Sequence, residues 1–269
     1  MKVNGKVIVV TGAGSGMGRA LSLQLIKDGA RVAGIDINEK GLEETRELAG
    51  NGAVAMSTHV VDITDRNRVE ALPAELIALH GAVDGIINNA GIIQPFVPIK
   101  DLDYDRIERV FNINLYGTLY MVKSFLPALL ERPEAHIVNI SSMGGFIPFP
   151  GQSFYGASKA AVKLLTEGLY AELKDSNVKV TVVHPGAVNT NITKNSNVEM
   201  RSEVSAEEQA SMTLSAEKAA EIILNGMKAD KYRVMVGKDA RFLDLFYRFS
   251  PKRAVDFIRK KMAQMAKAS

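Results

Sequence analysis

Cysteine is absent from this chain of 269 residues. Its absence excludes disulfide bonds, catalysis by a thiolate and cysteine ligands for a metal ion. Histidine is scarce as well, and the four residues at positions 59, 80, 136 and 184 lack the spacing of metal ligands. We therefore expect no catalytic metal. His184, which stands directly before Pro185, is most simply a packed or turn residue.

The chain also lacks a hydrophobic run that would predict a membrane span. Its longest uncharged stretch, residues 135–158, contains two prolines, four glycines and several hydroxyl side chains, which is not the composition of a spanning helix. A signal peptide is not expected either, because the first predicted strand begins at residue 6. A cytoplasmic location follows by default, and we expect no nucleic-acid partner.

A single α/β domain is predicted from short apolar runs that alternate with helical patterns. Such alternation predicts a doubly wound parallel sheet of about seven strands with helices on both faces, as in a Rossmann-like fold. No Pro/Ser-rich linker divides the chain, so we expect one catalytic domain over residues 1–237 and a helical extension over residues 238–269. The predicted strands are residues 6–10, 31–35, 53–58, 85–88, 136–141, 179–183 and 233–236.

A glycine-rich motif, Thr11-Gly12-Ala13-Gly14-Ser15-Gly16-Met17-Gly18, follows the first predicted strand and precedes a helical pattern. Strand, glycine loop and helix in this order are the context of a dinucleotide-binding site. The glycines let the backbone approach a pyrophosphate, and the helix N-terminus offers free N–H groups and partial positive charge. We expect cofactor contacts from Gly12, Ser15, Gly16, Met17 and Gly18.

Asp36 lies at the end of the second predicted strand, 18 residues beyond Gly18. An acidic residue at this distance is placed to accept hydrogen bonds from the adenosine ribose. Its carboxylate would repel a 2′-phosphate, and the neighbouring Ile37 offers no compensating charge. The sequence therefore predicts NAD rather than NADP. The alternative is that Asp36 is a solvated residue capping the helix that starts near residues 38–39.

Tyr155 and Lys159 are four residues apart in a segment that is predicted to be helical after Ser153. Residues at this spacing share one face of a helix. An ammonium group near the phenol would favour its ionised form, which makes Tyr155 a candidate proton donor and acceptor near neutral pH. An ordinary surface pair is the alternative, and the upstream glycine motif argues against it.

From residue 6 to about residue 192, the order and spacing of motifs resemble those of the short-chain dehydrogenase/reductase family of the single-domain type. The motifs are the glycine pattern of residues 11–18, Asn88-Asn89-Ala90-Gly91, Asn114 in Asn112-Ile113-Asn114-Leu115, Ser142 in Asn139-Ile140-Ser141-Ser142, the pair Tyr155 and Lys159, and Pro185-Gly186-Ala187-Val188-Asn189-Thr190. The resemblance implies an oxidoreductase that transfers a hydride between NAD(H) and an alcohol or ketone.

The resemblance also implies roles for four catalytic residues. Tyr155 would exchange the proton, and Lys159 would lower its pKa and bind the nicotinamide ribose. Ser142 would hydrogen-bond the substrate oxygen; Ser141 competes for this role on spacing alone, and the family pattern favours Ser142. Asn114 would hold a water that links Lys159 to solvent, or it is instead a buried residue that satisfies backbone groups.

Further contacts are implied by the same resemblance. Asp62 and Ile63 would meet the adenine; Asn89, Ala90 and Gly91 would lie against the adenosine ribose; and Pro185, Gly186, Val188 and Thr190 would frame the nicotinamide carboxamide. Residues 189–214 would form a flap over the substrate, with a plain excursion as the alternative. A homodimer or homotetramer would form through helices around 103–130 and 153–174.

The expected substrate is a hydrophobic secondary alcohol or ketone. The residues expected near the nicotinamide are Ile92, Ile93, Phe96, Gly144, Phe146, Ile147, Phe149 and Phe154. They are mostly apolar, although any one of them could be core alone. No arginine is expected at this place, which disfavours small acids. Lys194 and Arg201 in the expected flap could change that view.

The C-terminal segment, residues 228–269, is strongly basic, with 12 Lys or Arg against 4 Asp and thus a charge of +8. Phe242, Leu245, Phe246 and Phe249 recur at helical spacing. Such a tail packs on a neighbouring subunit, covers the substrate entrance or lies on an anionic membrane surface. We favour packing. The rival functions are therefore a non-catalytic regulatory protein of the same fold and a membrane-peripheral protein.

Overall fold

The computed structural model describes residues 1–196, 198 and 213–267. Seven parallel strands form one sheet in the order β3-β2-β1-β4-β5-β6-β7, which confirms the predicted doubly wound sheet. The strand order reverses between β1 and β4, where ligands of such sheets bind. The strands are β1 Val7–Thr11, β2 Arg31–Asp36, β3 Met56–Val60, β4 Gly85–Asn88, β5 Ala135–Ile140, β6 Val178–Pro185 and β7 Arg233–Val236.

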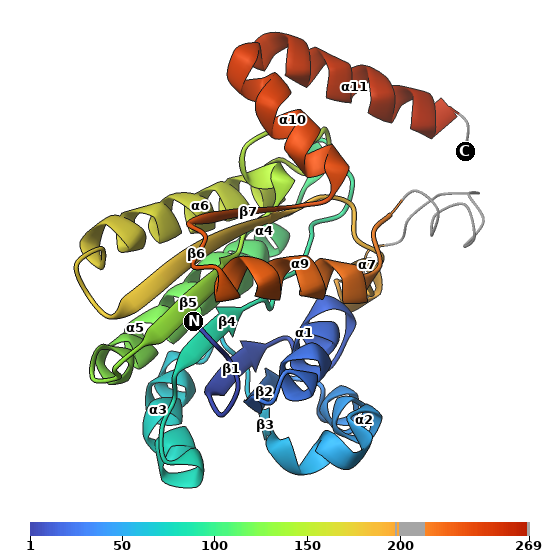
Figure 1. Ribbon diagram of the computed structural model, residues 1–269. Helices are drawn as coiled ribbons and strands as arrows, with labels where there is room; N and C mark the ends of the chain where they lie inside the picture. The colour runs from blue at the N-terminus through green and yellow to red at the C-terminus, as the bar shows by residue number, and fades with distance from the viewer. Residues whose placement is uncertain (197, 199–212, 268–269) are drawn as a thin grey trace.

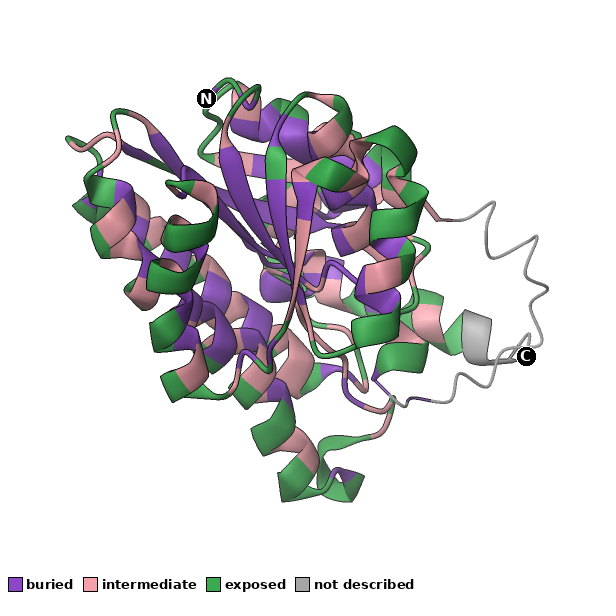
Figure 2. Cartoon of the chain, turned by 90° about the horizontal axis from the view of Figure 1, so that it is seen from below, coloured by how far each residue is buried: buried purple, intermediate pink, exposed green. Residues whose placement is uncertain are grey.

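Helices cover both faces of the sheet (Figure 1). Ile8 and Val10 of β1 face one apolar cluster, whereas Val7 and Val9 face the other, because successive side chains of a strand point to opposite faces. The first cluster involves α1 Gly16–Lys27, α2 Glu39–Leu48 and α9 Ala216–Lys228; the second involves α3 Arg66–His80, α5 Thr118–Leu130 and α6 Ser153–Glu172. Figure 2 shows the buried residues gathered in the strands and on the inward sides of these helices.

The third strand begins later than the sequence predicts. Residues 53–58 were expected to be extended, but Gly50–Ala55 form the 3₁₀ helix η1 and the strand is Met56–Val60. Gly50 has a φ of +55°, a left-handed conformation that glycine adopts without strain. Val54 is 97% exposed, so its β-branched side chain suggested a strand that packing does not support. The predicted start was three residues too early.

Short irregular elements occupy the carboxyl edge of the sheet and carry much of the cavity described below. The helix α4 Tyr104–Phe111 continues into α5 through a π-helical turn, η3 Asn112–Gly117. The other elements are the 3₁₀ helices η2 Ile99–Asp101 and η4 Met143–Gly145 and the single-turn helix α7 Ile192–Asn195. Each follows a strand or connects two helices near the switch point.

Two helices end the chain, α10 Lys238–Phe249 and α11 Pro251–Lys267. They form a hairpin beyond β7, far from the N-terminus (Figure 1). Leu243 and Ile258 are buried in this hairpin against Ile147, which follows η4. Among the described residues, no helix is long and apolar enough to cross a membrane.

Candidate active site

A cavity of about 990 Å³ runs along the carboxyl ends of the strands. Its wall includes the glycine loop after β1, Asp36 after β2, the loop after β4, and residues that follow β5 and β6. Every predicted cofactor-binding residue lines this cavity except Gly18, and so do Ser142, Tyr155 and Lys159. Segments that lie far apart in the sequence therefore meet in one crevice at the topological switch point.

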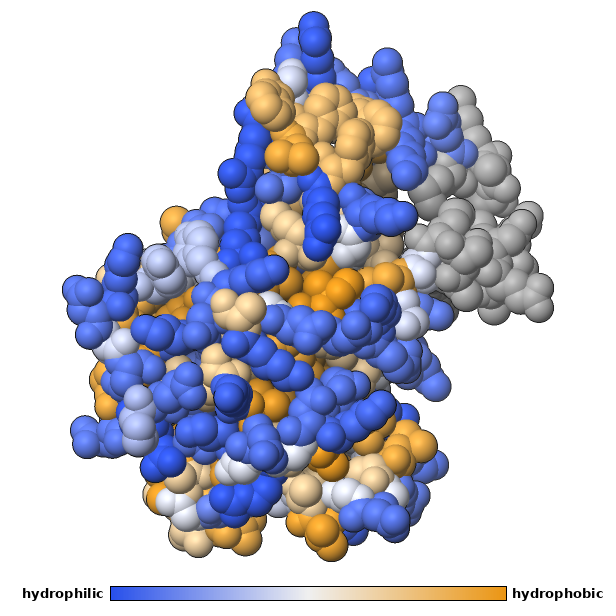
Figure 3. Space-filling view, in the orientation of Figure 1, coloured by the Kyte–Doolittle hydropathy of each residue, from blue (hydrophilic) through white to orange (hydrophobic). Residues whose placement is uncertain are grey.

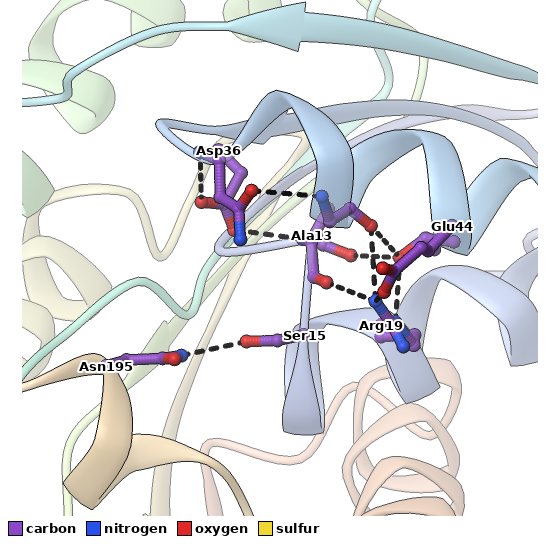
Figure 4. A network of polar contacts seen from close by, with 10 residues as sticks. Ala13, Ser15, Arg19, Asp36, Glu44 and Asn195 are labelled. Carbon is purple, nitrogen blue, oxygen red and sulfur yellow. Dashed lines mark hydrogen bonds and ion pairs between the residues drawn. The ribbon is translucent and has the colours of Figure 1, made fainter.

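The glycine loop presents an open helix N-terminus to this cavity. Ser15 is the N-cap of α1, but its side chain makes no capping hydrogen bond, and the first turn carries no acidic residue. Its hydroxyl instead accepts a hydrogen bond from Asn195 Nδ2 at 2.9 Å (Figure 4). The first amides of α1 therefore remain available to an anion such as a pyrophosphate.

Close packing explains why glycine is needed in the loop. A Cβ added to Gly12, whose φ is +71°, would lie 3.1 Å from Ala90 Cα. A Cβ on Gly18 would collide with the Gly12 carbonyl and lie 2.7 Å from Asn89 Nδ2. Gly18 lets α1 approach the loop, and its expected contact with the cofactor stays a prediction. The space beside the loop, which side chains at these positions would reduce, is suited to the pyrophosphate of a dinucleotide.

The Asp36 carboxylate is anchored at the cavity wall. Its Oδ2 accepts a hydrogen bond from Gly14 N at 2.9 Å and its Oδ1 accepts one from Asn38 N at 3.0 Å (Figure 4). The helix α2 is capped by Asn38, whose side chain accepts from Gly41 N at 3.1 Å. Each Asp36 oxygen keeps a further lone pair that could accept a hydroxyl donor.

Arg19 lies on the other side of Gly14 from Asp36, which the sequence analysis did not anticipate. Its guanidinium donates to Gly14 O at 2.6 Å and to Thr45 Oγ1 at 3.0 Å, and it pairs with Glu44 at 2.9 Å (Figure 4). The charge of this arginine is therefore balanced by Glu44. Because Arg19 is 17 residues before Asp36 in the sequence, no local pattern reveals the proximity.

Tyr155 lies in the first turn of α6, and Lys159 follows one turn later. Burial raises the pKa of Tyr155, while a hydrogen bond with the Ser142 hydroxyl acts in the opposite direction. Burial lowers the pKa of Lys159 to about 8, and its Nζ donates to Ile140 O at 2.9 Å. Desolvation is thus the larger influence on the pKa of the phenol, and the expected effect of the Lys159 ammonium on Tyr155 stays a prediction.

The two neighbouring serines have different partners. Ser141 Oγ donates to the Lys159 carbonyl at 2.7 Å and so joins β5 to α6. Ser142 Oγ accepts from Gly144 N at 3.0 Å and also pairs with the Tyr155 hydroxyl. The structure therefore brings Ser142 to the phenol, as the family pattern suggested, and gives Ser141 a structural partner.

His184 is a packed residue below this loop. Its Nδ1 lies 3.1 Å from the Ser142 carbonyl, and its ring meets Phe146 edge-on at 5.4 Å between centroids. Burial lowers its pKa, so the neutral ring with a proton on Nδ1 can donate to that carbonyl. No group of His, Asp or Glu in the described residues could hold a metal ion.

Asn114 sits inside the π-helical turn η3 and is fully buried. Its Oδ1 accepts from Ile92 N at 2.9 Å, and its Nδ2 donates to Ile92 O and Ser158 Oγ, each at 3.0 Å. Its side chain thus satisfies backbone groups and does not line the cavity. It nevertheless lies close behind Lys159, because a Cβ on Gly91 would be 3.1 Å from both Asn114 Oδ1 and Lys159 Nζ.

Gln94, which the sequence analysis missed, fixes the start of α6. Its Oε1 accepts hydrogen bonds from Phe154 N and Tyr155 N, both at 2.9 Å, and its Nε2 donates to Gly151 O at 2.9 Å. The N-cap position itself is Gln152, whose side chain makes no capping bond and donates to Gln94 O at 2.7 Å. The lack of Ser, Thr, Asp or Asn at this N-cap was a signal that the cap comes from elsewhere.

The expected apolar wall is present in part. Ile92, Ile93, Phe96, Gly144 and Phe149 line the cavity. Phe146 and Ile147 instead belong to the cluster under the C-terminal hairpin, and Phe154 packs edge-on against Phe111 at 6.4 Å. Arg109 also lines the cavity, although no arginine was expected there.

The expected flap is described only at its two ends. Asn189 N donates to Leu214 O at 2.8 Å, and Leu214 N donates to Ala187 O at 2.9 Å. Lys194 is exposed on α7. Arg201 lies outside the described residues.

Comparison with known proteins agrees with this geometry. The family model for short chain dehydrogenases matches residues 6–201. The chain belongs to this family. The candidate oxidoreductase SadH of Mycobacterium tuberculosis is 37% identical over 255 residues, which cover 91% of this chain and 90% of SadH. The protein is therefore an oxidoreductase of the short-chain dehydrogenase family, which uses a nicotinamide cofactor.

Two solved members of the family have the same fold. A short-chain dehydrogenase/reductase from Burkholderia phymatum, solved in complex with NAD, superposes with a TM-score of 0.79 at 26% identity and covers 87% of this chain and 90% of its own. A short-chain dehydrogenase from Streptomyces avermitilis superposes with a TM-score of 0.78 at 29% identity, covering 98% of this chain and 97% of its own.

Proposed function

We propose that this short-chain dehydrogenase transfers a hydride between NAD(H) and a hydrophobic secondary alcohol or its ketone, with Tyr155 as the general acid and base. The observation that carries this proposal is the meeting of the Tyr155 and Ser142 hydroxyls in the cavity that also contains the glycine loop and Asp36. The apolar residues Ile92 and Phe149 in the same wall favour a hydrophobic substrate.

The nicotinamide supplies or accepts the hydride when the cofactor is bound. During ketone reduction, the Tyr155 phenol gives its proton to the substrate oxygen, and the Ser142 hydroxyl donates a hydrogen bond to the same oxygen. Burial raises the pKa of Tyr155, which favours the protonated form that a proton donor needs. During alcohol oxidation, the same phenol must first lose its proton, and Lys159 is the cation closest in sequence to stabilise it.

The other contacts expected from the sequence form one proposed binding mode. The free amides of α1 bind the pyrophosphate, Asp36 binds the adenosine ribose, and Lys159 Nζ binds the nicotinamide ribose. Asp62 and Ile63 meet the adenine, and the carboxamide is framed by Pro185, Gly186, Val188 and Thr190. Asn114, which lies near Lys159, helps to hold a water that links Lys159 to solvent. We further propose that residues 189–214 cover the substrate.

NAD is the proposed cofactor because Asp36 lines the cavity, where its carboxylate would repel a 2′-phosphate. Arg19 is a nearby cation that could attract a 2′-phosphate, and Glu44 already balances it at 2.9 Å. The Burkholderia relative that was solved with NAD supports this choice.

A screen of hydrophobic alcohols and ketones, followed by NADH absorbance, tests the proposed reaction. Tyr155→Phe removes only the phenolic hydroxyl, so it should lower kcat by about 10²-fold or more. NAD should bind to this variant with an unchanged Kd, measured by calorimetry. A variant that retains most of its turnover would contradict the proposed role of Tyr155, and a protein that binds NAD but turns over no substrate would favour the regulatory alternative.

We also propose a homodimer or homotetramer formed through α4–α5 and α6. Exposed Tyr104, Tyr116 and Leu164 on these helices support it, with exposures of 82%, 45% and 69%. Light scattering after size-exclusion chromatography gives the mass directly, and Leu164→Lys should shift it toward the monomer.

A further inference from the structure

The C-terminal hairpin has one side fixed to the body of the protein. Leu243 and Ile258 are buried in the cluster with Ile147. Arg233 of β7 also donates to Asp244 of α10 at 2.9 Å, and both side chains are largely buried. These contacts fix the orientation of the hairpin, so its other side faces solvent.

That other side exposes large apolar residues in a stripe. Phe242, Leu245 and Phe249 are 54%, 58% and 87% exposed, and their spacing of three and four residues places them on one face of α10. Phe257 of α11, 40% exposed, continues the stripe with its ring centroid 6.0 Å from that of Phe242. We call these four residues the outer apolar face. Figure 3 shows hydrophobic atoms over α10, surrounded by hydrophilic ones.

Positive charge surrounds the outer apolar face. The two helices carry nine Lys or Arg and three Asp, a net charge of +6. In the described part of the hairpin, only Arg248 and Arg259 form ion pairs within it. Arg241, which precedes Leu245 by one turn, and Lys252, which follows Phe249 by three residues, are exposed and unpaired there. Basic and apolar side chains are thus both exposed on the hairpin.

We propose that the outer apolar face docks on the surface of an anionic lipid bilayer. Aromatic and leucine side chains enter the boundary between headgroups and acyl chains, while lysine and arginine bind lipid phosphates. A second copy of the chain fits less well, because a symmetric contact would oppose two surfaces of the same positive charge.

Sedimentation with vesicles tests the proposal on the full-length protein. Phosphatidylcholine vesicles with phosphatidylserine should carry the protein into the pellet at low salt, and pure phosphatidylcholine or high salt should release most of it. The triple variant Arg241→Gln, Lys252→Gln, Arg253→Gln should have a vesicle partition coefficient about a hundredfold lower. Each Lys or Arg near an anionic surface raises that coefficient roughly fivefold.

Two further variants isolate the apolar contribution. Leu245→Ser combined with Phe249→Ser should lose most of the vesicle binding and change the thermal unfolding midpoint little, because these side chains are 58% and 87% exposed. The matched control is Val54→Ser with Leu79→Ser, which removes side chains that are 97% and 61% exposed near β3, at the opposite edge of the sheet. This control should bind vesicles as the wild type does.

Three results would overturn the proposal. The first is equal sedimentation of the wild type with anionic vesicles and without them at low salt. The second is undiminished binding by the serine variant. The third is a wild type that self-associates without binding vesicles, together with a serine variant of lower mass in light scattering, which would make the outer apolar face a contact between copies. The catalytic proposal does not enter any of these outcomes.

Discussion

At the scale of single residues, the chemistry of the site depends on what each polar group contacts. Tyr155 gains a hydrogen bond with Ser142 but loses water, and the loss of water determines the direction of its pKa shift. The Asp36 carboxylate is held in place at the cavity wall, since its two oxygens accept backbone amides at 2.9 and 3.0 Å, and its negative charge should exclude a 2′-phosphate.

Asp36→Asn tests that exclusion. The substitution keeps the size of the side chain and removes its charge, so the ratio of kcat/KM for NADP to that for NAD should rise by about tenfold or more. Glu44→Gln, which removes the partner of Arg19, should shift the ratio in the same direction. A wild type that already prefers NADP would contradict the prediction.

Gln94 offers a second prediction at this scale. Gln94→Leu removes the acceptor of the Phe154 and Tyr155 amides, so Tyr155 should be displaced and kcat should fall by up to about a hundredfold. Gln94→Glu keeps the acceptor oxygens and should retain more activity than the leucine variant. The KM for NAD should change little in both. Steady-state kinetics with circular dichroism as a check of folding would decide, and equal losses in the two variants would argue for a purely structural role.

At the scale of elements, the site is assembled by the ends of strands and the starts of helices. The first turns of α1 and α6 both lack a cap from their own N-cap side chain. In α6 the free amides are satisfied by Gln94, whereas in α1 they remain directed at the cavity. The glycine loop makes this possible, because Gly18 lets α1 begin directly against Gly12.

Two glycine-to-alanine variants compare packing with helix propensity. Gly18→Ala should destabilise the protein by about 1–3 kcal/mol and weaken NAD binding, because its Cβ collides with the Gly12 carbonyl. Gly168→Ala is the matched control on α6, where an added Cβ meets nothing within 4 Å; it should stabilise by about 0.5–1 kcal/mol. Urea unfolding measures both, and equal effects would refute the packing argument.

At the scale of the whole molecule, the fold keeps its histidines neutral. Burial lowers the pKa of His59, His80, His136 and His184, and that of His136 falls to about 4. In the unfolded chain each of these histidines takes up a proton near pH 6.5. In the native protein they take up the proton only at a lower pH. The free energy of unfolding should therefore fall as the pH drops from about 6.5 toward 4.

His136 should account for the largest part of that loss. A pKa of about 4 against 6.5 corresponds to about 3 kcal/mol, present above pH 6.5 and lost by pH 4. His136→Gln should flatten the pH dependence of stability, measured by urea unfolding between pH 4 and 7. His80→Gln, at a less buried site, should flatten it less; an unchanged slope in the His136 variant would contradict the assignment.

Local patterns in the sequence determined the strands, the glycine loop, Asp36, the pair Tyr155 and Lys159, and hence the family. These features repeat with the period of the backbone or lie within one turn of each other, so their meaning does not depend on distant residues. Tertiary structure alone decided that Gln94 caps α6, that Asn114 is buried behind Lys159, that Arg19 reaches Gly14, and that β3 begins at Met56. Each of these features depends on which remote segments come into contact and on how much water they exclude. A local sequence pattern predicts neither of them.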